Sequence, residues 1–182
     1  MKPQSYKTII QKAHFGYAYF ELILGPGGTP ADYRFLEVNP AFERLTGLKG
    51  RDIVGKTMGE VAATTPQGEF SKLDTFARIA LEGGNETYEE YSKSRKVWYH
   101  VQVYSEEKGF FTTLLTDITE QKQAQEELKS QSTLLHTLVD NLPLALYVKD
   151  RNSRKTLINK DDARNMGIGS AEEGIGKSDF EI

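Results

Sequence analysis

The feature that most constrains this chain is a strand that runs into a long helix without a glycine or proline between residues 110 and 142. Residues 109–116 alternate like a strand inside a sheet, with Phe111, Thr113 and Leu115 on one face. A helical pattern follows and continues to residue 141. Because no flexible residue interrupts this stretch, we expect a distortion of the sheet to reach the helix directly. The junction that would couple them is Asp117, Ile118 and Thr119.

The helix is expected to begin at a cap supplied by Asp117 or Thr119, and with Asp117 as cap, Glu120 would complete a capping box. Counting by sevens from residue 121 places leucine at three of four a positions, whereas the d positions include Gln131. This pattern favours a parallel two-stranded coil and hence a homodimer. A single amphipathic helix packed on its own domain is the alternative. The leucines assigned to the dimer helix are Leu128, Leu135 and Leu138.

The net charge and the distribution of apolar residues exclude some classes of function. The 182 residues carry a net charge of −3, so no global charge favours nucleic acid as a partner. No apolar run reaches the ~18 residues of a membrane span, and the first residues lack the apolar core of a signal peptide. We therefore expect a soluble, cytoplasmic protein of one or two small domains.

Candidate chemistry is sparse. Cysteine is absent, which excludes disulfides, thiolate metal sites and thiol nucleophiles. His14, His100 and His136 are scattered and give no metal-ligand spacing. There is no nucleophile–His–carboxylate set, no GxGxxG and no P-loop. This stretch is therefore not expected to be an enzyme or to hold a metal.

The order of patterns predicts an α+β domain with helices on one face of an antiparallel sheet. Asn39 precedes Pro40 and is expected to be a structural cap of a helix that Gly47 ends. Residues 57–69 show no clear pattern. The remaining expected elements are strands at 15–24, 33–38, 86–91, 96–105 and 109–116, a short helix near 51–53, and a helix at 69–81 whose stripe includes Phe70.

After residue 143 the first pattern begins again, and we interpret this as an internal repeat. Two short strands, at 144–149 and 155–158, precede Asn159, which is expected to cap a helix ended by Gly167. Asn39 and Gly47 have the same spacing, and Gly55-Lys56 corresponds to Gly176-Lys177. Residues 143–182 therefore read as the first half of a second domain, and we expect the protein to continue past Ile182.

FLEVNPAFERLTGLKGRDIVGK (35–56), Trp98 and TDITEQKQAQEEL (116–128) together resemble a PAS domain followed by its signalling helix. YVKDRNSRKTLINKDDARNMGIGSAEEGIGKSDFEI (147–182) resembles the first half of another. The resemblance implies a five-stranded antiparallel sheet with helices over one face, which forms a small-molecule pocket or a partner surface. The implied domains are 5–118, a helix at 119–142, and 143–182.

Candidate ligand contacts lie on the long helix and the last two strands, although ordinary core packing explains most of them. They are Phe76, Ile79, Tyr99, Val101, Phe111, Thr113 and Leu115. Without cysteine the chain cannot form the flavin–thiol adduct of light-sensing relatives, and the helix at 69–81 lacks the histidine of haem-binding relatives. A non-covalent flavin near Trp98 or Tyr99 stays open, so the cofactor is unknown.

The resemblance implies a sensory-input and relay module of a bacterial-type signal-transduction protein, with a sensor histidine kinase as first choice and an output domain downstream. A diguanylate cyclase or phosphodiesterase is the alternative output. A protein–protein dimerisation scaffold without ligand is the alternative function. A cavity in the first domain would favour ligand binding, and a packed core would favour the scaffold.

Overall fold

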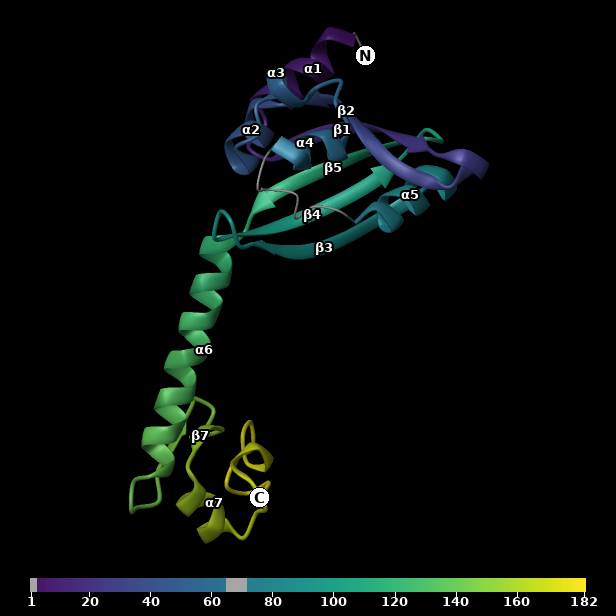
Figure 1. Ribbon diagram of the computed structural model, residues 1–182. Coiled ribbons are helices and arrows are strands. Elements are labelled where there is room, and N and C mark those ends of the chain that lie inside the picture. Colours follow the sequence, from purple (N-terminus) through teal and green to yellow (C-terminus); the bar gives the residue numbers. More distant parts are fainter. Residues whose placement is uncertain (1–2, 65–71) are drawn as a thin grey trace. The chain divides into compact units, whose positions relative to one another are not determined.

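The computed structural model describes residues 3–64 and 72–182 (Figure 1). The chain divides into two compact units, residues 1–122 (unit 1) and 123–182 (unit 2). In the described ranges no helix is long and apolar enough to cross a membrane.

Unit 1 contains one five-stranded antiparallel sheet in the order β2-β1-β5-β4-β3. This confirms the predicted α+β class, and the first two strands pair with each other as an antiparallel hairpin. The strand at the centre is the one that leads into the long helix, so it has a partner on both sides. The strands are β1 (Gly16–Leu24), β2 (Pro30–Val38), β3 (Gly84–Ser92), β4 (Val97–Ser105) and β5 (Phe110–Asp117).

The helices of unit 1 lie mostly between β2 and β3, in the order of the prediction. One of them, α4, occupies part of the stretch that showed no pattern, and Phe70 lies outside the described residues. A short 3-10 turn, η1 (Pro26–Gly28), joins β1 to β2. The helices are α1 (Pro3–Lys12), α2 (Pro40–Thr46), α3 (Gly50–Ile53), α4 (Met58–Thr64) and α5 (Leu73–Glu82).

The core lies between the inner face of this sheet and α2, α4 and α5 (Figure 1). Its centre is a group of rings from three strands and α5. Phe20 stacks on Phe111 at 4.7 Å between ring centroids, and Phe111 stacks on Phe76 at 5.1 Å. Each fully buried ring of this kind stabilises the fold by about 1.5–3 kcal/mol, so this cluster is a main source of the stability of unit 1.

Asn39, at the end of β2, connects several segments. It is 1% exposed, and its Oδ1 accepts hydrogen bonds from the N–H groups of Phe42 (2.8 Å) and Tyr17 (2.9 Å). Its Nδ2 donates to the carbonyls of Ile10 (2.9 Å) and Phe15 (3.0 Å). Asn39 therefore caps α2 and also ties α1 and β1 to it.

Unit 2 begins within α6 (Thr119–Asp140), whose first turn belongs to unit 1. A two-stranded antiparallel sheet of β6 (Tyr147–Lys149) and β7 (Lys155–Ile158) follows, so the first strand is shorter than the sequence predicted. After it come α7 (Lys160–Met166) and a 3-10 turn, η3 (Ala171–Glu173).

Asn159 makes the same four side-chain hydrogen bonds in unit 2 that Asn39 makes in unit 1. Its Oδ1 accepts from the N–H groups of Leu146 and Asp162, both at 2.9 Å. Its Nδ2 donates to the carbonyls of Val139 (3.1 Å) and Leu144 (2.7 Å). Unit 2 thus repeats the local architecture of unit 1 at this point, down to the individual bonds.

The agreement extends to the turns. Gly47 and Gly167 both end a helix with positive φ, 78° and 72°, a conformation that favours glycine. Further on, Gly55 N–H donates to the carbonyl of Phe35, and Gly176 N–H donates to that of Lys155. The internal repeat seen in the sequence is therefore also a repeat of backbone conformation.

Candidate functional site: an interior cavity and a strand–helix junction

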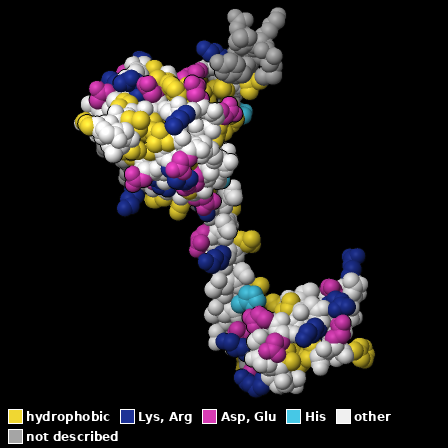
Figure 2. Space-filling view, turned by 90° about the vertical axis from the view of Figure 1, so that its right-hand side faces the viewer, with side chains coloured by type: hydrophobic (Ala, Val, Ile, Leu, Met, Phe, Trp, Pro, Cys, Tyr) yellow, Lys and Arg dark blue, Asp and Glu magenta, His cyan; other side chains and the backbone are white. Residues whose placement is uncertain are grey.

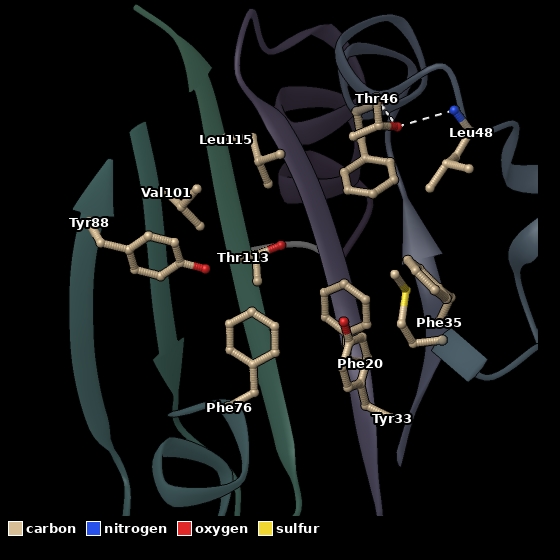
Figure 3. Close-up of a pocket in the computed structure, with 12 residues that line it drawn as sticks. Phe20, Tyr33, Phe35, Thr46, Leu48, Phe76, Tyr88, Val101, Thr113 and Leu115 are labelled. Atoms are coloured by element: carbon tan, nitrogen blue, oxygen red, sulfur yellow. Dashed lines mark hydrogen bonds between the residues drawn. The ribbon is translucent and has the colours of Figure 1, made fainter. Parts of the chain in front are cut away.

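Unit 1 holds a cavity of about 40 Å³ inside its core (Figure 3). Its wall combines the first hairpin, the short helices, α5 and strands β3, β4 and β5. The lining is almost wholly apolar. The lining residues are Phe20, Tyr33, Phe35, Phe42, Thr46, Leu48, Met58, Phe76, Tyr88, Val101, Thr113 and Leu115.

Hydroxyl groups are the polar part of this wall. Thr46 uses its hydroxyl within α2, where it donates to the carbonyl of Phe42 at 2.8 Å and accepts from Leu48 N–H at 3.2 Å. The hydroxyl of Tyr88 points toward Thr113 in Figure 3. Burial, and then the carboxylates of Glu90 and Glu86, raises the pKa of Tyr88, so this phenol stays protonated and is able to donate.

Four of the seven candidate ligand contacts line the cavity, namely Phe76, Val101, Thr113 and Leu115. The other three, Ile79, Tyr99 and Phe111, are buried in the same core but do not line it. The Tyr99 hydroxyl donates to the carbonyl of Leu45, so it holds α2 against β4. Phe111 lies between the rings of Phe20 and Phe76.

Most of the wall was missed in the sequence because it comes from the first hairpin and the short helices. The alternation in GYAYFELIL and YRFLEV would have pointed to Phe20, Tyr33 and Phe35, since these occupy every second position of each strand. Met58 belongs to the stretch without a pattern, and no signal marked it. The order of the strands places Phe20 on β1 beside β5, with Tyr33 and Phe35 on β2 next to it.

The size of the cavity limits what it holds. Pockets for drug-sized ligands and cofactors measure about 300–1,000 Å³, whereas a water molecule needs only about 10–15 Å³. The cavity in unit 1 therefore has room for a few water-sized groups. This volume is smaller than a flavin or haem, and the lining contains neither histidine nor a charged side chain. In the part of the chain that the structure describes, no three His, Asp or Glu side chains gather as metal ligands.

The junction between β5 and α6 is attached to β4 through the backbone of Trp98. Trp98 N–H donates to Thr119 Oγ1 at 2.9 Å, and Ile118 N–H donates to the Trp98 carbonyl at 2.9 Å. Asp117 Oδ1 accepts from Thr119 N–H at 2.9 Å. All three residues assigned to the junction therefore take part in one small network with Trp98.

The helix begins one residue later than a cap at Asp117 would require. Ile118 is the capping position, because its carbonyl accepts the first helical bond from Lys122 N–H at 2.9 Å. The expected bond from Glu120 N–H to Asp117 is replaced by one from Thr119 N–H. The reason is that pairing with β4 continues through Asp117, which keeps the backbone extended there.

The first turn of α6 has a further attachment to the sheet. Lys122 forms an ion pair with Glu89 on β3, and its ammonium lies 5.4 Å from the centroid of the Trp98 ring. Exposed ion pairs contribute little to stability, about 0–1 kcal/mol. Together with the two bonds to Trp98, this pair connects the start of α6 to both β3 and β4.

Three comparisons with known proteins bear on this fold. A family model described as PAS domain matches residues 23–120, more than half of the chain. The sensor histidine kinase TmoS from Ectopseudomonas mendocina is 33% identical over 110 residues, which cover 55% of this chain and 11% of the kinase. The chain thus spans about a tenth of the length of that curated relative.

Among solved structures, an RNA-binding light-oxygen-voltage receptor is similar with a TM-score of 0.49 and 19% identity, over 74% of this chain and 38% of the receptor. A domain of a sensory box sensor histidine kinase/response regulator from Geobacter sulfurreducens has a TM-score of 0.43 and 16% identity, over 63% of this chain and 92% of that domain.

Proposed function

The chain belongs to the PAS domain family, and from this premise we propose that it is a sensory-input and relay module of a signal-transduction protein. The whole protein is proposed to be a sensor histidine kinase, as TmoS is named. A cyclic-dinucleotide enzyme is the alternative output. In this proposal unit 1 receives the stimulus, and α6 carries it to an output domain in the same chain.

The observation that carries the proposal is the junction. Trp98 binds Ile118 and Thr119 through its own backbone, so β4 and the start of α6 share two hydrogen bonds. A shift of β4 relative to β5 therefore changes the geometry at the first turn of the helix. Val101, which lines the cavity, lies three residues further along β4 than Trp98. A change inside the core thus has a short covalent path to the junction.

We expect replacement of Thr119 by valine to loosen this junction. Valine keeps the shape but removes the oxygen that accepts from Trp98 N–H, which costs about 1–2 kcal/mol. Amide hydrogen exchange should become about tenfold faster at Trp98 and also at the first bonded amides of α6, from Lys122 onward. Thr116→Val is the matched control, because Thr116 is exposed near the end of β5 and its replacement should leave both rates unchanged.

If Thr119→Val speeds exchange at Trp98 while the amides from Lys122 onward keep their wild-type rates, the helix does not follow the sheet. The relay would then be wrong. Unchanged exchange at both places would show that the Thr119 bond does not hold the junction.

Two candidate roles for the cavity remain, and an observation supports each. The Tyr88 and Thr113 hydroxyls in an apolar wall are typical of a site that orients a small molecule. The volume of about 40 Å³ instead supports a core filled by its own side chains, as in the dimerisation scaffold. We propose a small, mostly apolar ligand that displaces side chains as it binds.

The leucines of α6 support a homodimer. Leu128, Leu135 and Leu138 are 69%, 50% and 59% exposed in the single chain, so their apolar surfaces lie uncovered there. Burial of such surface against a second copy would stabilise the assembly by about 25 cal/mol per Å² of apolar area. In the heptad pattern these side chains occupy the a and d positions of the proposed parallel coil.

We expect Leu135→Glu to weaken the dimer by about a hundredfold, because the coil would bury two carboxylates without partners. Sedimentation equilibrium measures the change. Thr133→Glu is the matched control, since it adds the same charge at an outward f position of the same helix. A wild-type chain that sediments as a monomer, or equal weakening by both variants, would contradict the dimer.

We further propose that residues 143–182 form the first half of a second PAS copy. The four bonds of Asn159, the positive φ of Gly167 and the backbone bond from Gly176 to Lys155 all support this. Their counterparts in unit 1 are the bonds of Asn39, Gly47 and Gly55.

A further inference from the structure

The repeat allows the cavity wall of unit 1 to be traced into unit 2, residue by residue. In β1 and β2 the pair Ala18–Val38 is followed, across a β-bulge, by Phe20–Phe35. In β6 and β7 the pair Tyr147–Ile158 is followed, across the same kind of bulge, by Lys149–Lys155. Lys149 and Lys155 therefore occupy the positions of Phe20 and Phe35.

Two more wall positions follow from the caps. Phe42 donates its N–H to Asn39, and Asp162 donates its N–H to Asn159. Thr57 N–H donates to the Glu60 carboxylate, and Ser178 N–H donates to that of Glu181, both at 2.8 Å. Because Met58 follows Thr57 and Asp179 follows Ser178, these two residues correspond.

Four apolar wall residues of unit 1 are thus exchanged for two lysines and two aspartates in unit 2, and these four charged groups meet. Lys155 Nζ lies 3.0 Å from Asp162 Oδ2 and 3.7 Å from Asp179 Oδ1. Lys149 donates to Asp179 Oδ2. The side chains of Lys155 and Asp162 are 4% and 9% exposed. Charges of both signs also intermix on the surface of unit 2 (Figure 2).

The two aspartates differ in how they are held. Asp162 is buried on α7 and pairs with Lys155. Asp179 is 56% exposed, follows the last glycine turn, and places its carboxylate between the two ammonium groups. The hydrogen bond from Lys149, reinforced by the charges of Lys149 and Lys155, lowers the pKa of Asp179, so this carboxylate is ionised at neutral pH.

If the Asp179 carboxylate moves away, Lys149, Lys155 and Asp162 together carry one unbalanced positive charge. Lys155 keeps Asp162 as its counter-ion, whereas Lys149, whose side chain is 25% exposed, loses the acceptor of its hydrogen bond. Another anion of similar shape would therefore be attracted to the two ammonium groups in place of Asp179. The Tyr147 ring, 4.4 Å from Lys155 Nζ, adds an apolar side to this position. The arrangement matches a small organic molecule with one carboxylate group.

We propose that Lys149 and Lys155 form a binding site for a small monocarboxylate in unit 2, and that Asp179 is the internal carboxylate that this ligand displaces. The site corresponds in place to the apolar cavity of unit 1 but has the opposite chemistry. The correspondence rests on the proposed second copy, whereas the ion cluster does not. The two PAS-like units of this chain would therefore respond to different classes of small molecule.

Acetate is the probe that tests this site on the whole 182-residue chain. Amide chemical shifts are followed while sodium acetate is added, with sodium chloride of equal ionic strength as the reference titration. We expect acetate-specific shifts around Lys149, Lys155 and Asp179 and none in unit 1. Asp179→Asn should bind acetate about tenfold more tightly, because it removes the competing carboxylate while keeping the shape of the side chain.

Glu181→Gln is the matched control. Glu181 lies on the same turn but bonds to Arg154 and Ser178 rather than to the two lysines, so its loss should not tighten acetate binding. Lys149→Met in the Asp179→Asn background should abolish the response. The proposed site would be wrong if acetate and chloride caused identical amide shifts both in the wild type and in Asp179→Asn. For this comparison the variant must keep the amide dispersion of a folded protein. That result would leave the relay in unit 1 unaffected, because the relay is measured at Trp98 and Lys122.

Discussion

Replacing Asn39 with alanine is expected to lower the free energy of unfolding of unit 1 by about 4 kcal/mol. The substitution removes the side-chain partner of two N–H groups and two carbonyls at buried or partly buried sites. The Ile10 carbonyl keeps the N–H of Ala13, and each of the other three groups costs about 1–3 kcal/mol when it is left unpaired. A cap alone is worth only about 1 kcal/mol. A loss of about 4 rather than about 1 kcal/mol would therefore show that Asn39 joins α1, β1 and α2 and is more than a local helix cap.

Urea unfolding followed by Trp98 fluorescence measures this loss, because the single tryptophan of the chain lies in unit 1. Asn159→Ala is the matched control, since it removes the same four bonds from unit 2. It should leave the Trp98 transition in place and loosen unit 2 instead, as seen in its amide exchange. If Asn39→Ala lowers the free energy of unfolding by only the ~1 kcal/mol of a helix cap, the other hydrogen bonds of Asn39 must be replaced by new ones.

Phe111→Ala is the second change expected to have a large effect, about 4 kcal/mol of destabilisation. The ring is 1% exposed, stacks on Phe20 and Phe76, and meets Tyr33 edge-on at 5.6 Å. Its removal leaves a space beside the existing cavity that its rigid neighbours cannot fill. Benzene should then bind there and recover part of the lost stability, in proportion to its concentration.

Phe110→Ala provides the control on the same strand. Phe110 points to the opposite face of the sheet, is only partly buried, and stacks on Tyr19 at 5.7 Å. Its loss should cost about 1 kcal/mol and create no benzene site. Equal losses for both variants, measured by urea unfolding, would contradict the placement of the core on the Phe111 face.

The local elements of this chain were predictable because their signals are local. The alternation in residues 109–116 predicted β5, and Asn39 with Gly47 predicted the two ends of α2. The predicted helix 119–142 begins where α6 begins, but its cap was assigned to Asp117 or Thr119 and lies at Ile118 between them. Asp117 has the residue type of a cap, but its backbone stays paired with β4, and this pairing depends on a strand that lies elsewhere in the sequence.

Four of the twelve residues of the cavity wall were predicted from the sequence. Thr113 and Leu115 followed from the period of their strand, and the alternation in β1 and β2 marks Phe20 and Phe35 as inward-facing residues. That these residues share one wall depends on the order of the strands. The same holds for Trp98, whose backbone bonds to Ile118 and Thr119 are set by the order of the strands rather than by its own neighbours.

The sequence by itself determined the family resemblance, the order of the elements, the uninterrupted passage from β5 to α6, and the internal repeat. These depend on periodicity, caps and glycine turns, which act within a few residues of one another. Only the tertiary structure decided which faces meet. It enclosed Phe76 and Leu115 around one small cavity and brought Lys155 together with Asp162 and Asp179, because contacts between distant segments follow from the pairing of strands and the packing of helices on them.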